Sequence, residues 1–358
     1  MTIRPSIHWL LALVPVAVVI DRAGAPAPLV FLAAGLAIVP LAALIVHSTE
    51  HVAEHTGPAV GGLLNATFGN LPELIICVVA LRAGLVEMVR ASLVGAIMAN
   101  VLLGLGLAFL LGGRRHVMEF NPAGARAYGS MLMLAVITLS VPAAFHRLLG
   151  TEAPASRWTV DLGTSLALLA TYACYLVYMM WTHADFFAAS DTGDHDGHGP
   201  VWGVPRAVGT LLAASVGAAW MSEILVGAAE ATGHALGMGP IFLGMVLLAV
   251  IGGAAETGSA IAMGRRNKPD LAVGIALGSS VQIALFVTPV LVLLSALIAP
   301  VPLGLAFNRL EIGVLLLGTL IMVTTAGDGQ ATWFKGVQML MVYLIIAWSV
   351  YWLPIAAP

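Results

Sequence analysis

The sequence predicts an all-α integral membrane protein of about 11 transmembrane helices, with two inverted five-helix repeats following one extra N-terminal helix. Composition is the first reason: of 358 residues, 60% are hydrophobic and only 9% are charged, against roughly 25% charged residues in soluble domains. A chain of this kind lacks the polar surface that water requires, so the bilayer must serve as its solvent. The second reason is a motif that recurs in the two halves of the chain.

Charged residues, Gly/Pro clusters and polar turns divide the chain into apolar stretches of the length that crosses a bilayer, about 20 residues each. We expect spans at 6–20, 28–46, 57–82, 86–112, 127–146, 160–181, 205–231, 238–264, 270–298, 307–325 and 333–354. The first resembles a signal peptide, but no clear small-residue cleavage site follows it, so we expect a retained helix. Cys77 and Cys174 lie inside apolar stretches and imply neither a disulfide nor a cysteine metal site.

The recurring motif is a glutamate that follows helix-weakening residues. The first half contains Gly-Asn-Leu-Pro-Glu at 69–73, and the second contains Gly-Gly-Ala-Ala-Glu at 252–256. Glu256 follows Glu73 by 183 residues, and Gly278 follows Gly95 by the same distance. Any bundle of Gly, Ala and Leu resembles itself, but a shared offset between matched glutamates is hard to obtain by chance. Each copy has an odd number of spans, so the second would enter the membrane inverted, as is typical of secondary transporters.

The predicted organisation has four parts. They are 1–27, the first transmembrane helix and its loop; 28–182, repeat 1 with spans 2–6; 183–204, an acidic, histidine-bearing loop; and 205–358, repeat 2 with spans 7–11. With the N-terminus inside, nine of the 15 Lys and Arg residues lie on the inner side, so the positive-inside rule favours a cytoplasmic N-terminus and a cytoplasmic acidic loop. Short loops and the absence of an N-terminal extension favour a bacterial inner (plasma) membrane.

Glu73 and Glu256 are the candidate cation ligands. Each lies within an apolar span, where a carboxylate is costly and is a functional candidate by default. Each follows residues that permit a break in the helix, Gly69 in the first half and Gly252 and Gly253 in the second. A broken helix frees backbone carbonyls, and carboxylates together with carbonyls suit a hard cation such as Ca²⁺. The alternative is a protonated glutamate hydrogen-bonded to a neighbouring helix.

Two longer stretches resemble the repeat signatures of the calcium/cation antiporters, in the cation/proton (CAX-type) branch. The first is Leu-Leu-Asn-Ala-Thr-Phe-Gly-Asn at 63–70 followed by Glu73, and the second runs from Asp270 to Phe286. The resemblance extends in pieces from about residue 45 to 300. It implies that Glu73 and Glu256 hold the transported cation and also carry protons. The supporting residues of the site would be Gly69, Asn70, Asn100, Gly252, Gly253, Ser279, Ser280 and Gln282.

The chain departs from the family pattern at several of these positions. The usual Gly-Asn-Ala-Thr-Glu is Gly-Asn-Leu-Pro-Glu at 69–73, and the usual Gly-Asn-Ala-Ala-Glu-His is Gly-Gly-Ala-Ala-Glu-Thr at 252–257. Serines expected in the Gly-Ser-Ile-Leu-Ser-Asn signature are Ala96 and Ala99. The site therefore has fewer polar oxygens than its relatives, which leaves Na⁺ or K⁺ open as alternatives to Ca²⁺.

A second polar group lies at 47–55. On a helix, His47, His51 and His55 share one face, as do Glu50 and Glu54, and a comparable polar group precedes the next span in the other half. One interpretation is a vestibule that gathers cations and passes protons, because His titrates near neutral pH. The other is a solvated helix end. The predicted vestibule residues are Glu50, His51, Glu54, Glu223, Glu230 and His234.

The acidic loop also has two interpretations, a regulatory divalent-cation sensor and a solvated linker. It lies where relatives carry a cytoplasmic acidic segment linked to cation sensing. Its candidate residues are Asp191, Asp194, His195, Asp196 and His198.

These observations predict a secondary active cation/proton antiporter that exports Ca²⁺ in exchange for H⁺ by alternating access. A Na⁺-driven exchanger, a monovalent (Na⁺/K⁺) cation/proton antiporter and a channel are the alternatives. His-x-x-Glu-His at 47–51 and 51–55 formally matches a metalloprotease pattern, a remote alternative that needs a third zinc ligand. We expect no enzyme activity, no cofactor, no nucleic-acid partner, and Ca²⁺ only as the transported ion.

Overall fold

The computed structural model describes residues 7–56, 61, 63, 64, 67–149, 154–183 and 202–353. These residues are mostly helical, as expected in lipid, where a helix satisfies its own backbone hydrogen bonds. Within the described part, eight helices are long and apolar enough to cross a membrane. They become nine when the broken pair Pro240–Gly252 and Ala254–Arg265 counts as one span. Each of the eleven predicted spans contains helix, although α1 and α4 are shorter than a full span.

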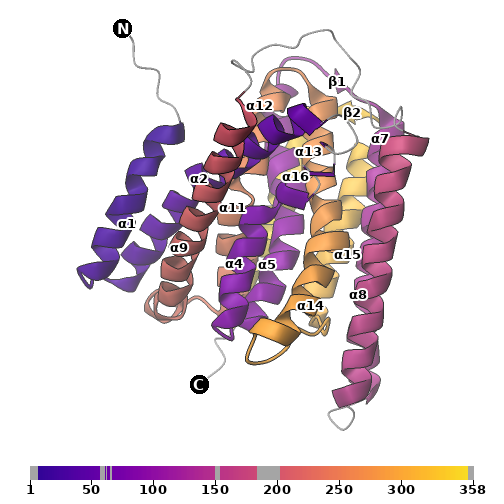
Figure 1. Ribbon diagram of the computed structural model, residues 1–358. Coiled ribbons are helices and arrows are strands. Elements are labelled where there is room, and N and C mark those ends of the chain that lie inside the picture. Colours follow the sequence, from indigo (N-terminus) through magenta and orange to yellow (C-terminus); the bar gives the residue numbers. More distant parts are fainter. Residues whose placement is uncertain are drawn as a thin grey trace, which may run out of the picture. The chain divides into compact units, whose positions relative to one another are not determined.

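The helices and strands are named as in Figure 1. In addition, η1 is a 3₁₀ turn, and η2, η3, η5 and η6 are π-helical turns. The described elements are η1 (Ile7–Ala12), α1 (Leu13–Arg22), α2 (Ala27–Thr56), α4 (Leu71–Arg82), α5 (Val86–Met98), η2 (Ala99–Gly104), α6 (Leu105–Gly112), β1 (Met118–Glu119), α7 (Pro122–Leu149), α8 (Pro154–Val177), η3 (Tyr178–Thr182), α9 (Val204–Leu236), α10 (Pro240–Phe242), η5 (Leu243–Leu248), α11 (Ala249–Gly252), α12 (Ala254–Arg265), α13 (Pro269–Gln282), η6 (Ile283–Val287), α14 (Thr288–Ile298), α15 (Arg309–Ala326), β2 (Gln330–Ala331) and α16 (Trp333–Tyr351).

The chain forms two compact units. Unit 1 comprises residues 1–92, 200–255 and 350–358, and unit 2 comprises 93–199 and 256–349. Each unit therefore takes segments from both halves of the sequence. In particular, Glu73 belongs to unit 1 and Glu256 is the first residue of a segment of unit 2.

Unit 1 is built on α2 and α9, which pack along each other, with α1, α4 and α11 against them (Figure 1). Small residues allow these close contacts: Gly35 of α2 faces Ile251, and Gly217 of α9 faces Leu41. In lipid, helices associate through such close packing because the surrounding tails are as apolar as the side chains. Unit 1 thus presents α4, which carries Glu73, against a rigid helix pair.

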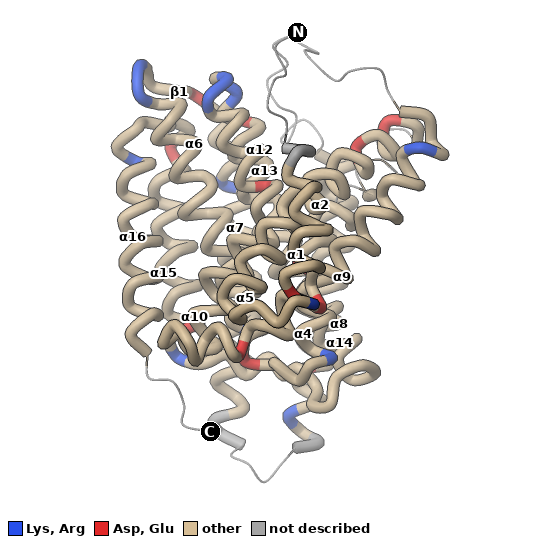
Figure 2. The backbone as a smooth tube through the Cα atoms, turned by 90° about the vertical axis from the view of Figure 1, so that its left-hand side faces the viewer, with Lys and Arg blue, Asp and Glu red and all other residues tan. Residues whose placement is uncertain are grey.

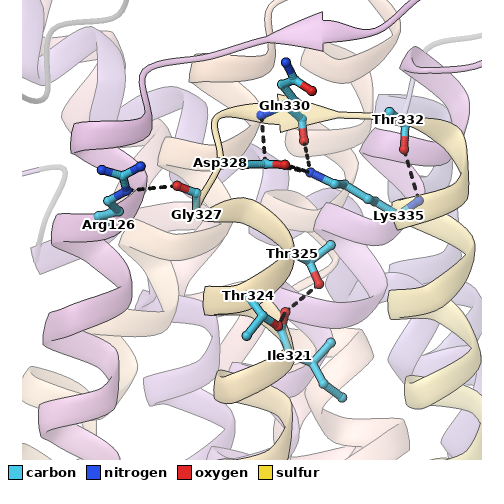
Figure 3. Close-up of polar contacts among 9 residues, drawn as sticks. All are labelled: Arg126, Ile321, Thr324, Thr325, Gly327, Asp328, Gln330, Thr332 and Lys335. Atoms are coloured by element: carbon cyan, nitrogen blue, oxygen red, sulfur yellow. Dashed lines mark hydrogen bonds and ion pairs between the residues drawn. The ribbon is translucent and has the colours of Figure 1, made fainter.

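Unit 2 is built around α7, which packs against α8, α13 and α15, while α14 packs against α8. β1 and β2 form an antiparallel pair in which Met118 faces Ala331 and Glu119 faces Gln330. The loop before β2 is fixed by polar contacts (Figure 3): the Lys335 ammonium bonds both Asp328 oxygens at 2.6 Å, and Arg126 Nε donates to the Gly327 carbonyl at 2.9 Å. These contacts tie the ends of α7, α15 and α16 together.

Helix boundaries recur at the spacing of the sequence motif. Both ends of α12 lie 183 residues after the corresponding ends of α4, and α13 begins 183 residues after α5. α5 runs into a π-helical turn at Ala99, and α13 runs into one at Ile283. π-Helical turns are rare and often mark functional sites, so their recurrence extends the internal similarity from sequence motifs to backbone conformation.

Candidate cation-binding site

Glu73 lies in the first turn of α4, as the third residue of the helix. Pro72, in the same turn, has no N–H to lose and a φ angle already suited to a helix start. The first N–H groups of a helix have no intrahelical partner and carry partial positive charge. The sequence Asn-Leu-Pro-Glu thus places a carboxylate where the backbone favours its negative charge.

The Glu73 side chain is buried, with 5% of its surface exposed. Neither carboxylate oxygen accepts a hydrogen bond from another of the described residues. Gly252 of α11 lies directly against it, because a Cβ on Gly252 would stand 3.1 Å from the Glu73 Cγ. A buried carboxylate is costly unless a partner neutralises it. Glu73 is therefore suited to holding an exchangeable cation or proton.

Glu256 occupies the equivalent position in unit 2, as the third residue of α12, and is 8% exposed. The residue before each helix has a similar backbone conformation: Asn70 has φ −96° and ψ 25°, and Gly253 has φ −79° and ψ 14°. The break between α11 and α12 falls at Gly253, as the sequence predicts. Both glutamates thus begin a helix after a short break in an apolar segment.

Polar residues of unit 2 that are distant in sequence meet near the π-helical turn η2. Asn100 Nδ2 donates to Ser279 Oγ at 3.1 Å, and both side chains are buried. Ser280 is satisfied within α13, since its Oγ donates to the Ala276 carbonyl at 2.8 Å. Gln282 is half-buried at the end of the same helix. Asn100 and Ser279, both predicted site residues, are therefore brought together.

Thr257 replaces the histidine of the family pattern. Gly104 of η2 faces it, because a Cβ on Gly104 would lie 3.4 Å from the Thr257 hydroxyl oxygen. Thr257 was not among the predicted site residues. Its position directly after Glu256 is the sequence feature that could have indicated it. Among the described residues, no group of three or more His, Cys, Asp or Glu side chains is arranged to hold a metal ion.

The predicted vestibule residues separate into two groups at opposite ends of α9, which spans 33 residues and is therefore about 50 Å long. At its start, the buried His51 ring stacks on Trp202 with centroids 4.8 Å apart. His51 Nε2 is 3.2 Å from His47 Nε2, and its Nδ1 is 3.2 Å from Glu54. Glu50 is exposed beside them. Sequence reasoning missed Trp202, because only the folded chain brings it to α2.

The other group lies toward the end of α9. Glu223 and Asp21 line a cavity of 510 Å³, and Glu223, Glu230 and Arg82 line a second of 430 Å³. His234 is exposed one helical turn beyond Glu230. Arg82 is the last residue of α4, the helix that Glu73 begins. The predicted loop residues at 191–198, as well as Asn65 and Ala66 of the motif, lie outside the described residues.

A buried contact between a histidine and an aspartate in unit 2 was not predicted from the sequence. His146 Nε2 lies 3.1 Å from Asp161 Oδ1, and both side chains are buried. Arg157 donates to the His146 carbonyl at 3.3 Å. The only signal in the sequence was an aspartate near the start of an apolar span.

Comparison with known proteins defines the class of this protein. The family described as sodium/calcium exchanger protein matches residues 26–181 and 206–352. The chain belongs to this family of membrane transporters and is an integral membrane protein rather than an enzyme.

Three similar proteins place the chain within the family. A Ca²⁺/H⁺ antiporter of Synechocystis sp. is 37% identical over 341 residues, covering 91% of each chain. The Ca²⁺/H⁺ antiporter ChaA of Bacillus subtilis is 36% identical over 337 residues, covering 93% of this chain and 95% of its own. The solved structure of native YfkE superposes with a TM-score of 0.83 at 33% identity, covering 97% of this chain and 100% of its own.

Proposed function

We propose that this protein is a secondary active Ca²⁺/H⁺ antiporter. The observation that carries the proposal is the pair of buried glutamates, each the third residue of a helix that follows a break. Two relatives named Ca²⁺/H⁺ antiporter match more than nine-tenths of this chain. Both glutamates lie within the residues that the family matches, 26–181 and 206–352.

The mechanism follows from competition at Glu73 and Glu256. Ionised, the two carboxylates and neighbouring neutral oxygens hold Ca²⁺, which prefers oxygen ligands. Protonated, they lose the charge that holds the ion, and the ion leaves. Within unit 2, Asn100 and Ser279, which are joined by a hydrogen bond, offer an amide and a hydroxyl oxygen. Coupling requires that the protein rarely switches from one side of the membrane to the other while its site is ionised and empty.

Alternating access would come from the two repeats, 28–182 and 205–358, inserted with opposite orientation. The matching bounds of α4 and α12, and the π-helical turns after α5 and α13, support this arrangement. In such transporters the ion site lies near the bilayer midplane, between the repeats. The two vestibule groups at opposite ends of α9 then serve opposite sides of the membrane. The bacterial relatives and the count of basic residues favour a plasma membrane and a cytoplasmic N-terminus.

Ion identity is tested in proteoliposomes that enclose an acidic buffer and a pH dye. Ca²⁺, Na⁺ or K⁺ is added outside in turn, and the rate of internal alkalinisation is recorded. We expect Ca²⁺ alone to release protons with saturable kinetics. A response to Na⁺ or K⁺ alone would instead assign the protein to monovalent exchange, in keeping with Gly253, Ala96 and Ala99. Absence of any response would contradict proton coupling.

A further inference from the structure

Four arginines occupy two neighbouring turns at one end of unit 2. We call them the arginine platform: Arg114 and Arg115 after α6, and Arg265 and Arg266 at the end of α12. All four are exposed. A hydrogen bond of 2.8 Å between His116 Nε2 and Asn267 Oδ1 joins the two turns. In Figure 2 the corresponding basic stretches lie beside β1 and α12.

The platform is rigid because its two supporting helices touch. A Cβ on Gly112 would collide with the Gly264 carbonyl oxygen, and one on Gly264 would lie 2.6 Å from the Ala108 carbonyl oxygen. Glycine at both positions lets the helix ends meet backbone to backbone. The turn after α12 is hydrogen-bonded through Arg266 N–H to the Ala262 carbonyl and Lys268 N–H to the Met263 carbonyl. The arginine pairs are therefore held side by side before any ligand arrives.

The guanidinium groups of the platform are available to a ligand. None makes a side-chain hydrogen bond or ion pair with a described residue. Among the acidic groups near the same end, Asp270 accepts from the Asn121 N–H at 2.7 Å and Asp328 pairs with Lys335, while Glu119 of β1 is exposed. Four like charges in adjacent turns repel one another, and the two helix C-termini offset only part of this repulsion. A bound external anion would offset the remaining repulsion among the arginines.

The place of the arginine platform along its helices indicates which kind of anion it binds. α6 is apolar to its end, and the last apolar residues of α12 are 260–264, so the arginines stand where the hydrocarbon layer gives way to headgroups. Guanidinium groups bind phosphate oxygens through paired hydrogen bonds, and basic pockets between transmembrane helices hold anionic headgroups. We propose that the arginine platform binds the phosphodiester headgroup of an anionic membrane lipid.

The test measures lipid retention and melting temperature of the purified protein in neutral detergent. Phosphatidylglycerol, phosphatidylcholine or inorganic phosphate is added in separate arms. Phosphatidylglycerol should be retained in native mass spectra and should raise the melting temperature, whereas phosphatidylcholine should do neither. The variants R114Q/R115Q and R265Q/R266Q should each bind phosphatidylglycerol more weakly, by about fivefold per arginine lost.

The matched control is R22Q/R309Q, which removes the same charge from exposed arginines elsewhere and should bind the lipid as the native protein does. Arginine-to-lysine replacements at the platform keep the positive charge but lose the planar guanidinium group. They provide a second test in case the glutamine variants misfold. Unchanged retention in the glutamine or the lysine variants would overturn the proposal. Equal stabilisation by inorganic phosphate would also overturn it, because a soluble anion would then be the ligand.

Discussion

At the scale of single residues, the proposed mechanism depends on a carboxylate that is buried without a fixed partner. Glu73 has a favourable backbone field from the first turn of α4, yet no described neighbour donates a hydrogen bond to its oxygens. A permanent partner such as Arg would neutralise the charge and compete with the cation. Leaving the carboxylate unpaired keeps the two charged ligands, Ca²⁺ and H⁺, in direct competition.

Gly252 should be needed for this arrangement. Its replacement by Ala would place a Cβ 3.1 Å from the Glu73 Cγ, so the glutamate must shift. We expect Gly252→Ala to raise the apparent KM for Ca²⁺ about tenfold, equivalent to about 1.4 kcal/mol. Gly209→Ala, at an exposed site of α9 with nothing within 4 Å of the new Cβ, should leave KM unchanged. Equal KM values for the two variants in the pH-dye assay would contradict a role of the Gly252–Glu73 contact in Ca²⁺ binding.

At the scale of elements, glycines set how closely helices pack. A Cβ on Gly336 of α16 would collide with the Leu110 amide nitrogen of α6, and Gly106 of α6 faces Leu340 and Met339. Close backbone approach of this kind replaces the hydrophobic drive that membrane helices lack. α6 precedes the platform turn and follows η2, so its packing also fixes the position of Asn100.

Gly336→Ala should therefore lower stability in spite of the better helix propensity of Ala. Overpacking of this kind costs typically about 1–3 kcal/mol, which should appear as a lower melting temperature in detergent. Gly313→Ala in α15, where nothing lies within 4 Å of the new Cβ, is the matched control and should be neutral or stabilising. A melting temperature for Gly336→Ala at or above that of the control would show that α6 and α16 can move apart without loss of stability.

The loop between α15 and α16 should stabilise the fold to an extent that depends on pH. Partial burial alone would raise the pKa of the Asp328 carboxyl, but the hydrogen bond from Lys335, and that from the Gln330 N–H, hold the pKa below its usual 3.8. The ion pair therefore stabilises the fold above about pH 4 and is lost as pH falls through the lowered pKa.

Lys335→Met should accordingly cost no more than about 1 kcal/mol at pH 7, because the pair is partly exposed and screened. Thermal melts of the native protein and the variant should converge as the pH falls below the usual pKa of 3.8. A gap between them that widens on acidification would contradict the assigned pair.

At the scale of the whole molecule, the proposed inversion of the two repeats predicts on which side of the membrane two matched positions lie. Ala83 and Arg266 are exposed residues that follow α4 and α12 by one position, 183 residues apart. In a C77A/C174A background, Ala83→Cys and Arg266→Cys should react with a membrane-impermeant maleimide from opposite sides. Labelling from the same side would rule out inverted repeats.

Much of this organisation was visible in the sequence because lipid imposes simple rules on helices. The stretch expected at 86–112 is α5 through α6, and the break at Gly253 falls where glycines predict it. The stretch expected to end at residue 46 instead continues as α2 to Thr56. Its polar last turns are helical and pack through His51 on Trp202, a contact between distant segments that periodicity does not encode. The His146–Asp161 pair was missed for the same reason.

The most direct test of the central claim compares coupled exchange in Glu73→Gln, Glu256→Gln and Glu87→Gln. Glu87 is an exposed glutamate in the first turn of α5 and serves as the matched control. All three proteins are reconstituted at equal density after size-exclusion chromatography has shown that they are folded, and Ca²⁺-driven proton release is recorded. We expect loss of coupled exchange in the first two variants and native rates in the third. Coupled exchange that survives in either Glu73→Gln or Glu256→Gln would contradict this expectation.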